Sequence, residues 1–317
     1  MKFDIYKKKT FTTSWNHFNT KPKANNSVSN LFKKLKKILK KYLNFNLSIK
    51  IKSNKKVKDE TFISYQTNEE IIKYRNILLK EKIIDYLNLF EIKFLEKDVN
   101  KYIEEYCIVF SKSKVTELGS GFGFNEGLFL FCILKVIKPT IVIESGIMKG
   151  FTSYIIDASI DINCSFFCYD INFDNIEFKS NKAKYYNSDI TENIPNLKGE
   201  RVFAFWDDHI SQLDRLNFSL KHNIKFNVFD DDLGFLTFHS DGWPPIPSIT
   251  MLKEIKQQTI KSDQVEWICR GRKGEINLKN IDMAKSYEKI NHHRIFPNLF
   301  DITGYKSHSQ CSFVIIK

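Results

Sequence analysis

Long apolar runs are absent from this 317-residue sequence. A helix that spans a bilayer needs about 20 consecutive apolar residues, and no stretch reaches even about 18. The N-terminus also lacks the apolar core that marks a secretory signal peptide. We therefore expect a cytoplasmic protein that is either free or attached peripherally to a membrane.

Cysteine is too scattered for a disulfide or zinc framework. Six cysteines are present, at positions 107, 132, 164, 168, 269 and 311. Cys164 and Cys168 lie close together in the sequence, but no second pair or histidine cluster joins them. We interpret all six as buried thiols in a reducing compartment.

Acidic residues are scarce at the N-terminal end. Residues 1–60 hold 17 lysines against three acids, a balance of +14, and the remainder holds 32 basic and 34 acidic residues, a balance of −2. The net charge of +12 therefore belongs to the tail and not to the body. Arginine is also rare, with six among the 49 basic residues.

Residues 30–46 have the pattern of an amphipathic helix. Leu31, Leu35, Ile38 and Tyr42 fall on one face, and lysines fall on the other. Such a helix can dock onto the body, lie on an anionic membrane at about 1 kcal/mol per lysine, or bind nucleic acid. A cluster of arginines with interleaved aromatics would favour nucleic acid, and it is missing.

The pattern along the chain divides it into three regions. Residues 1–60 form the basic, partly flexible tail that contains the amphipathic helix. Residues 61–112 form a helical cap, because 68–91 and 95–110 carry aliphatic side chains at three- and four-residue steps. Residues 113–317 change to a strand-and-helix pattern and form the main domain.

The main domain predicts an α/β fold with a doubly wound, mostly parallel sheet. Five apolar or β-branched runs alternate with helical stretches: TIVIES, SFFCYD, KYYNSD, VFAFWDD and FNVFDDD. Runs that are apolar throughout indicate strands buried on both faces, and CSFVIIK closes the chain as a final strand. Each of the five runs ends in a carboxylate or leads straight into one. Ligands in such sheets gather at the carboxyl ends of the strands, so these acids lie where chemistry would take place.

Two glycine-rich turns compete for the role of a nucleotide-binding turn. VTELGSGFGFNEG, residues 115–127, follows a stretch that is too polar for a central strand. IVIESGIMKGFTS, residues 141–153, follows an apolar β-branched run and leads into a helix. Asp170 ends the next strand 24 residues after Gly146, about the distance at which an acid reaches a ribose hydroxyl. We favour the second turn, although an ordinary strand-to-helix turn would use the same glycines.

The residues of the second turn also carry a resemblance. ESGIMKG resembles the E-x-G-x-x-x-G first motif of class I S-adenosylmethionine-dependent methyltransferases, and more narrowly the branch that contains macrocin O-methyltransferases and cephalosporin-hydroxylase-like proteins. FWDDH is similar to the Asp-Gly-Asp-His stretch of that branch, and VFDDD to its Asp-Asp. The likeness covers residues 140–235 well and 113–140 loosely. It implies a Rossmann-like methyltransferase fold in which Gly119, Gly121 and Gly123 belong to a loop near the pocket or to a helix cap.

The resemblance also implies a cofactor, S-adenosylmethionine, and residues that would hold it. Glu144 would face the methionine amine, Gly146 and Gly150 would let the backbone approach, and Asp170 would accept both ribose hydroxyls. Asp189 would accept from the adenine amino group or from a bridging water. The small hydroxyl residues that follow the turn in that branch correspond here to Thr152 and Ser153.

Five carboxylates converge on neighbouring strand ends: Asp207, Asp208, Asp230, Asp231 and Asp232. So many negative charges are costly to bring together without a cation, and hard oxygen ligands suit Mg²⁺ or Mn²⁺. We predict that Asp207 or Asp208, with Asp230 and Asp231, holds a divalent cation beside an acceptor hydroxyl. His209 is then the expected general base, with Asp208 beside it at the reacting hydroxyl. The alternative is that these acids cap the following helices and stay solvated.

Together these features predict a metal-assisted O-methyltransferase that acts on a sugar, glycan or related small-molecule hydroxyl. Three other functions stay open. A dinucleotide oxidoreductase would use the same sheet but prefers G-x-G-x-x-G. A nucleic-acid methyltransferase would use the basic tail, and a non-catalytic binding protein would use the same fold without the chemistry.

Overall fold

The computed structural model describes residues 69–113, 115, 122–237, 244–257, 262–269, 271–278, 281–307 and 309–317. The basic tail, the predicted helix at 30–46, Gly119 and Gly121 lie outside the described residues. In order along the chain the elements are α3 (Glu69–Asn88), α4 (Glu96–Lys112), α5 (Phe124–Ile137), β1 (Ile141–Ser145), α6 (Phe151–Ser159), β2 (Ser165–Tyr169), β3 (Ala183–Tyr186), β4 (Val202–Trp206), α7 (Gln212–Lys221), β5 (Phe226–Phe229), α8 (Ile249–Lys256), β6 (Gln264–Cys269), β7 (Arg272–Asn277), α9 (Ile281–Glu288), β8 (Ile290–Ile295), α10 (Phe300–Thr303) and β9 (Ser312–Ile316).

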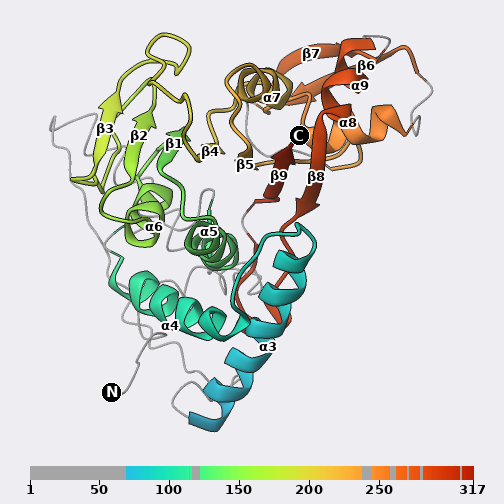
Figure 1. Cartoon of the computed structure of the whole chain (residues 1–317). Helices are drawn as coiled ribbons and strands as arrows, with labels where there is room; N and C mark the ends of the chain where they lie inside the picture. The colour runs from blue at the N-terminus through green and yellow to red at the C-terminus, as the bar shows by residue number, and fades with distance from the viewer. Residues whose placement is uncertain are drawn as a thin grey trace, which may run out of the picture.

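A seven-stranded sheet forms the centre of the molecule (Figure 1). Its order is β3-β2-β1-β4-β5-β9-β8, and the strands from β3 to β5 are parallel. β9 is antiparallel to both of its neighbours, β5 and β8. The predicted doubly wound, mostly parallel sheet is confirmed, and each of the six expected strands forms at its run, with β3 beginning one residue before KYYNSD.

Both faces of the sheet are covered by helices. Alternate residues of a strand point to opposite faces, so each central strand contributes side chains to two core clusters. Val142, Phe203 and Phe205 join one core cluster, which includes side chains of α3, α4, α5 and α6. Ile143, Ala204 and Trp206 join a second cluster with side chains of α7 and α8. Burial on both faces explains why β2, β4 and β5 contain no charged residue, whereas β1 contains Glu144.

The N-terminal helices α3 and α4 pack on α5 and share its core cluster. They confirm the predicted helices at 68–91 and 95–110. Tyr106 donates its hydroxyl hydrogen to the carbonyl of Phe124 at 2.8 Å. A Cβ at Gly127 would lie 2.4 Å from the Tyr106 hydroxyl oxygen, so the absence of a side chain there lets α4 approach α5.

The first glycine-rich turn ends at Gly123, which is the N-cap of α5. The Gly123 backbone N–H donates to the Glu126 carboxylate at 3.1 Å. This placement fits the expectation that Gly123 belongs to a helix cap.

Among the described residues, no helix is long and apolar enough to cross a membrane.

Candidate active site

The second glycine turn forms a bend at the carboxyl end of β1, the strand that lies between β2 and β4. Gly146 and Gly150 have φ angles of 88° and 84°, in the left-handed region that favours glycine. A Cβ at Gly146 would lie 2.1 Å from the Asp207 carbonyl oxygen, and one at Gly150 would lie 2.4 Å from the Phe178 carbonyl oxygen. Both glycines are therefore required by backbone geometry and by the close approach of neighbouring segments.

Glu144 is fully buried beneath the bend. Its Oε2 atom accepts hydrogen bonds from the Ser153 hydroxyl at 2.6 Å and from the Cys168 thiol at 3.5 Å. Its Oε1 atom is buried and has no hydrogen-bond partner among the residues that the structure describes. Burial raises the pKa of Glu144 to about 8, and the bonds from Ser153 and Cys168 oppose the shift. A buried oxygen without a partner is suited to a ligand that donates from the bend.

The Glu144→Gln variant is expected to fold and to be more stable than the natural protein at high pH. The folded-state pKa of Glu144 lies above its unfolded value, so the wild type binds this proton more tightly when folded and loses stability as pH rises from about 4.5 to 8. Glutamine mimics the neutral carboxyl and cannot ionise. Urea unfolding of both proteins between pH 5 and 9 should show a difference that grows with pH. A constant difference would contradict the raised pKa.

Asp170 lies at the end of β2, next to the bend. Its Oδ2 atom accepts the backbone N–H of Ile147 at 2.7 Å and of Met148 at 3.2 Å. Its Oδ1 atom accepts the Asn172 backbone N–H at 2.9 Å. Met148 in the bend and Ile171, the residue after Asp170, are 50% and 84% exposed. The end of β2 and the bend thus offer a carboxylate and exposed apolar residues, the kinds of group that a nucleoside site needs.

Thr152 and Ser153 lie in the first turn of α6, and both are buried. Ser153 orients Glu144 through the hydrogen bond described above. Its predicted contact with a cofactor would thus be indirect.

Asp207, His209 and Asp231 form the group that could hold a cation. One ligand atom from each lies within 4.8 Å of the others. Burial raises the pKa of Asp207 well above its ordinary range, and the carboxylates of Asp230, Asp231 and Asp208 raise it further. Like charges so close together favour a bound cation. An imidazole beside two carboxylates suits a first-row transition metal such as Mn²⁺ better than it suits Mg²⁺, which takes oxygen ligands.

The other two predicted ligands have different partners. Asp208 accepts the Arg215 Nε–H at 2.7 Å and the Ile210 backbone N–H at 3.2 Å. Asp230 is buried and accepts from the Cys311 thiol at 2.8 Å. The structure thus brings Asp207 and Asp231 together with His209, and leaves Asp208 and Asp230 beside the group.

Arg215 is a site residue that the sequence analysis missed. Its buried guanidinium forms ion pairs with Asp208 and Asp189, and it lies 5.4 Å from the centre of the Trp206 ring. Burial alone would raise the pKa of Asp189, but hydrogen bonds from Arg215 and Thr191 outweigh it and bring the pKa to about 2. Asp189 therefore has a cation for a partner, and its predicted adenine contact would use oxygens already engaged by Arg215. Only the helical spacing of Arg215 after the acidic stretch could have pointed to it.

A pocket opens next to the acidic group. Apolar parts come from Trp206, Ile210 and Pro245, and polar parts come from Gln212, Arg215 and Asp230 together with residues 207–209. The enclosed space is only about 10 Å³, room for about one water molecule. It is far below the ~300–1,000 Å³ typical of whole-ligand pockets, so it can take one small polar group of a ligand and not a whole ring.

Both predicted bound groups pass a test of fit. For the cofactor, Glu144 Oε1 has no hydrogen-bond partner among the described residues, and a Cβ at Gly146 or Gly150 would collide with backbone atoms. These features mark a place where a hydrogen-bond donor could lie close to the main chain. For the cation, the donor set is two carboxylates and an imidazole at short separation.

No protein-family model matches the chain, and no curated protein sequence matches it either. Among solved structures, the chain is similar to an O-methyltransferase from Bacillus cereus in complex with SAH, with 9% identity over 74% of this chain and 96% of that one and a TM-score of 0.38. It is similar to O-methyltransferase TomG from Streptomyces achromogenes in complex with SAM, with 7% identity over 73% and 94% and a TM-score of 0.37. It is also similar to the SAH-bound methyltransferase PaMTH1 of Podospora anserina, with 11% identity over 81% and 99% and a TM-score of 0.35. Function therefore has to follow from the chemistry of the site residues.

Proposed function

We propose that the protein is an S-adenosylmethionine-dependent O-methyltransferase assisted by a divalent cation. The observation that carries the proposal is the Gly146–Gly150 bend between two acids, Glu144 and Asp170, with the Asp207–His209–Asp231 group at the next strand ends. The bend at the end of β1 offers hydrogen-bond acceptors for a nucleoside that carries an amine. The Asp207–His209–Asp231 group, which begins at the end of β4, offers ligands for a cation, and β4 is a neighbour of β1 in the sheet.

On the cofactor side, the residues bind and orient. S-adenosylmethionine, when bound, supplies a methyl group on a positively charged sulfur. Glu144 offers its partnerless Oε1 to the amine, and Asp170 offers its carboxylate to the ribose hydroxyls. Met148 and Ile171 supply apolar surface for the adenine ring. Positioning of this kind accounts for much of the rate in transfer reactions that need little covalent chemistry.

On the acceptor side, Asp207, His209 and Asp231 would hold the cation. A divalent cation, when bound, supplies Lewis-acid charge that favours the deprotonated form of an acceptor hydroxyl. His209 lies in this group, and its side chain is 32% exposed, so an acceptor hydroxyl could approach it from solvent. The proposal keeps the general-base role predicted for His209 together with a ligand role. Asp208 holds Arg215 against the pocket instead of contacting the reacting hydroxyl.

The acceptor that we propose is a sugar, glycan or related small-molecule hydroxyl. In support, the pocket is lined by Ile210 and Pro245 beside several hydrogen-bonding groups, which suits the hydroxyl-bearing edge of such an acceptor. The lysine-rich residues 1–60 would bring the enzyme to an anionic membrane surface where lipid-linked glycans are found. The same charge is the feature that favours a nucleic-acid acceptor. Salt-dependent RNA binding that disappears on removal of residues 1–60 would select that alternative.

Isothermal calorimetry with S-adenosylhomocysteine, with and without Mn²⁺ or Mg²⁺, tests the proposal directly. We expect S-adenosylhomocysteine, the product of methyl transfer, to bind the natural protein. We also expect Mn²⁺ and Mg²⁺ each to bind in the absence of this product. Failure of the product to bind, together with binding of a nicotinamide cofactor, would make the protein an oxidoreductase instead.

The Asp231→Asn variant should lose metal affinity while it keeps affinity for the product. Asparagine retains the shape of the side chain but not its charge, so we expect Mn²⁺ to bind at least about 100-fold more weakly, because even outer partners of a metal site are worth about 10–100-fold. Asp214→Asn is the matched control, because Asp214 is exposed in the first turn of α7. Equal Mn²⁺ affinity in Asp231→Asn and Asp214→Asn would rule out the proposed ligand set.

A further inference from the structure

Two members of the Asp207–His209–Asp231 group have an unfavourable backbone conformation. His209 has a φ of 56° and Asp231 a φ of 53°, both in the left-handed region although neither is glycine. Such conformations persist only where the surroundings hold them, and they are concentrated at functional sites. The surroundings of Asp231 therefore determine whether its carboxylate stays beside Asp207.

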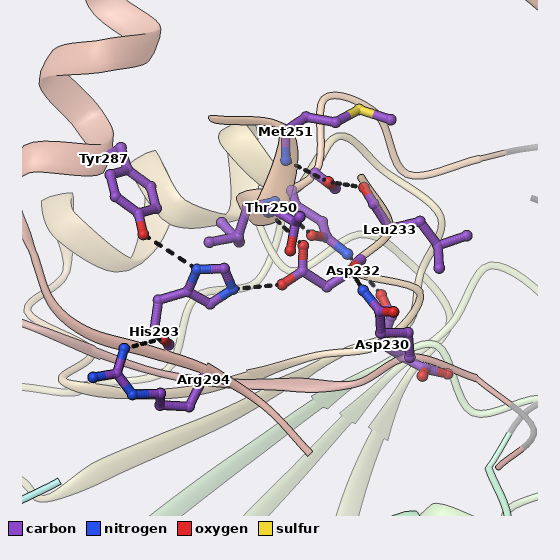
Figure 2. A network of polar contacts seen from close by, with 12 residues as sticks. Asp230, Asp232, Leu233, Thr250, Met251, Tyr287, His293 and Arg294 are labelled. Atoms are coloured by element: carbon purple, nitrogen blue, oxygen red, sulfur yellow. Dashed lines mark hydrogen bonds and ion pairs between the residues drawn. The ribbon is translucent and has the colours of Figure 1, made fainter. Parts of the chain in front are cut away.

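The next residue, Asp232, is anchored on the opposite side of the chain. It is fully buried, and its Oδ2 atom lies 2.8 Å from His293 Nε2 on β8. Its Oδ1 atom accepts the Thr250 backbone N–H at 2.6 Å. Figure 2 shows the Asp232 side chain held between the His293 ring and the start of α8, with Tyr287 beyond the ring.

The backbone of the same segment is also fixed. The Asp232 N–H donates to the Gln310 carbonyl at 2.8 Å, and the Gln310 side chain donates back to the Asp232 carbonyl at 2.6 Å. The Gln212 side chain donates to the Asp230 carbonyl at 2.6 Å. The residues on both sides of Asp231 are thus fastened, and its left-handed turn is the link between them.

We propose that Asp232 and His293 are positioning residues that hold Asp231 in its left-handed conformation and so place its carboxylate for the cation. The inference rests on the proposed function for the role of the cation. The structural part of the inference, that the Asp232–His293 pair sets the conformation of Asp231, does not depend on that function. Neither residue touches the cation in this arrangement. They act through one peptide link, because the bonds of the Asp232 side chain to His293 and Thr250 add to the Gln310 bonds of its backbone in fixing the residue next to Asp231.

The test compares His293→Ala with His293→Gln, in full-length protein. Alanine removes the donor to Asp232, whereas the glutamine amide can donate from nearly the position of the histidine Nε2. We expect Mn²⁺ affinity, read from the electron paramagnetic resonance signal of the free ion, to fall about 10–100-fold in His293→Ala and to recover in His293→Gln. Affinity for S-adenosylhomocysteine should stay within about twofold in both, because Glu144 and Asp170 lie on other strands.

The matched control is His292→Ala. His292 precedes His293 on the same strand and lies against Phe90, with 5.9 Å between the ring centroids, on the other face. A general loss of packing at β8 would affect both histidine variants, whereas a positioning role affects His293 alone. If His293→Ala does not fold, Asp232→Asn serves in its place, since it keeps the acceptor for Thr250 and loses the charge that faces His293.

Crystal structures of the variants separate this inference from the proposed function. We expect Asp231 to leave its positive φ in His293→Ala and to keep it in His293→Gln. Wild-type Mn²⁺ affinity in His293→Ala, with Asp231 unmoved, would overturn the inference. If the natural protein binds no Mn²⁺, the metal role fails, and the φ of Asp231 in the variant crystal still decides whether the pair positions it.

Discussion

The Gly146→Ala variant is expected to lose about 2–5 kcal/mol of stability and all measurable affinity for S-adenosylhomocysteine. The φ of 88° costs an alanine about 1–2 kcal/mol relative to glycine. Its Cβ would lie 2.1 Å from the Asp207 carbonyl oxygen and 2.8 Å from the Asp208 nitrogen, both backbone atoms that cannot rotate away. Overpacking of this kind costs about a further 1–3 kcal/mol.

The binding loss has the same origin. The Gly146 N–H donates to the Tyr169 carbonyl at 2.9 Å, and the Asp207 N–H donates to the Ser145 carbonyl at 2.8 Å. A methyl group at Gly146 would push the ends of β1 and β4 apart and break this alignment. The bend and Asp207 would then move together, and both halves of the site would be lost.

Gly199→Ala is the control that isolates the contact. Gly199 also has a left-handed φ, 79°, but a Cβ there would meet nothing within 4 Å. We expect it to cost about 1–2 kcal/mol and to leave binding unchanged. Urea unfolding and calorimetry measure both effects. Equal losses in the two variants would show that the approach of Asp207 to the bend does not matter.

The strands and the bend could be predicted from the sequence because their causes are local. A run such as VFAFW is apolar at every position, which only a strand buried on both faces explains, and β4 is indeed buried throughout. The spacing from Gly146 to Asp170 predicted an acid within reach of a ribose at the turn. The structure places Asp170 at the bend, where its carboxylate accepts the N–H groups of Ile147 and Met148, and the ribose contact stays a prediction. Features that depend on one strand and the turn after it can be predicted without knowledge of the rest of the chain.

The partners of the acids could not be predicted, because they come from distant segments. Cys311 bonds to Asp230 across 81 positions, and His293 bonds to Asp232 across 61. The five acids at these strand ends look alike in the sequence, and only their contacts distinguish them. Asp207 and Asp231 lie with His209, Asp208 pairs with Arg215, and Asp230 and Asp232 bond to Cys311 and His293. The β6–β7 hairpin was also missed, since its strands carry charges at many positions and pair only with each other.

The Arg215→Met variant should lose about 3–5 kcal/mol of stability, because one buried cation serves two carboxylates. Methionine keeps the packing against Trp206 but leaves Asp208 and Asp189 without the guanidinium that pairs with both. Arg201→Met is the control, since Arg201 is exposed and its side-chain Nε–H donates to a backbone carbonyl, that of Lys138, at 2.8 Å. Its loss should stay within about 0.5 kcal/mol.

The pH dependence identifies the ion pair as the cause. The folded-state pKa of Asp189, about 2, lies below its unfolded value near 4, so the pair's contribution is complete above pH ~4 and is lost as pH falls toward 2. In Arg215→Met the pKa of Asp189 should rise, and the stability gap between wild type and variant should narrow between pH 4 and pH 2. A gap of constant size over that range would mean that Arg215 stabilises the fold by packing on Trp206 and not by its charge.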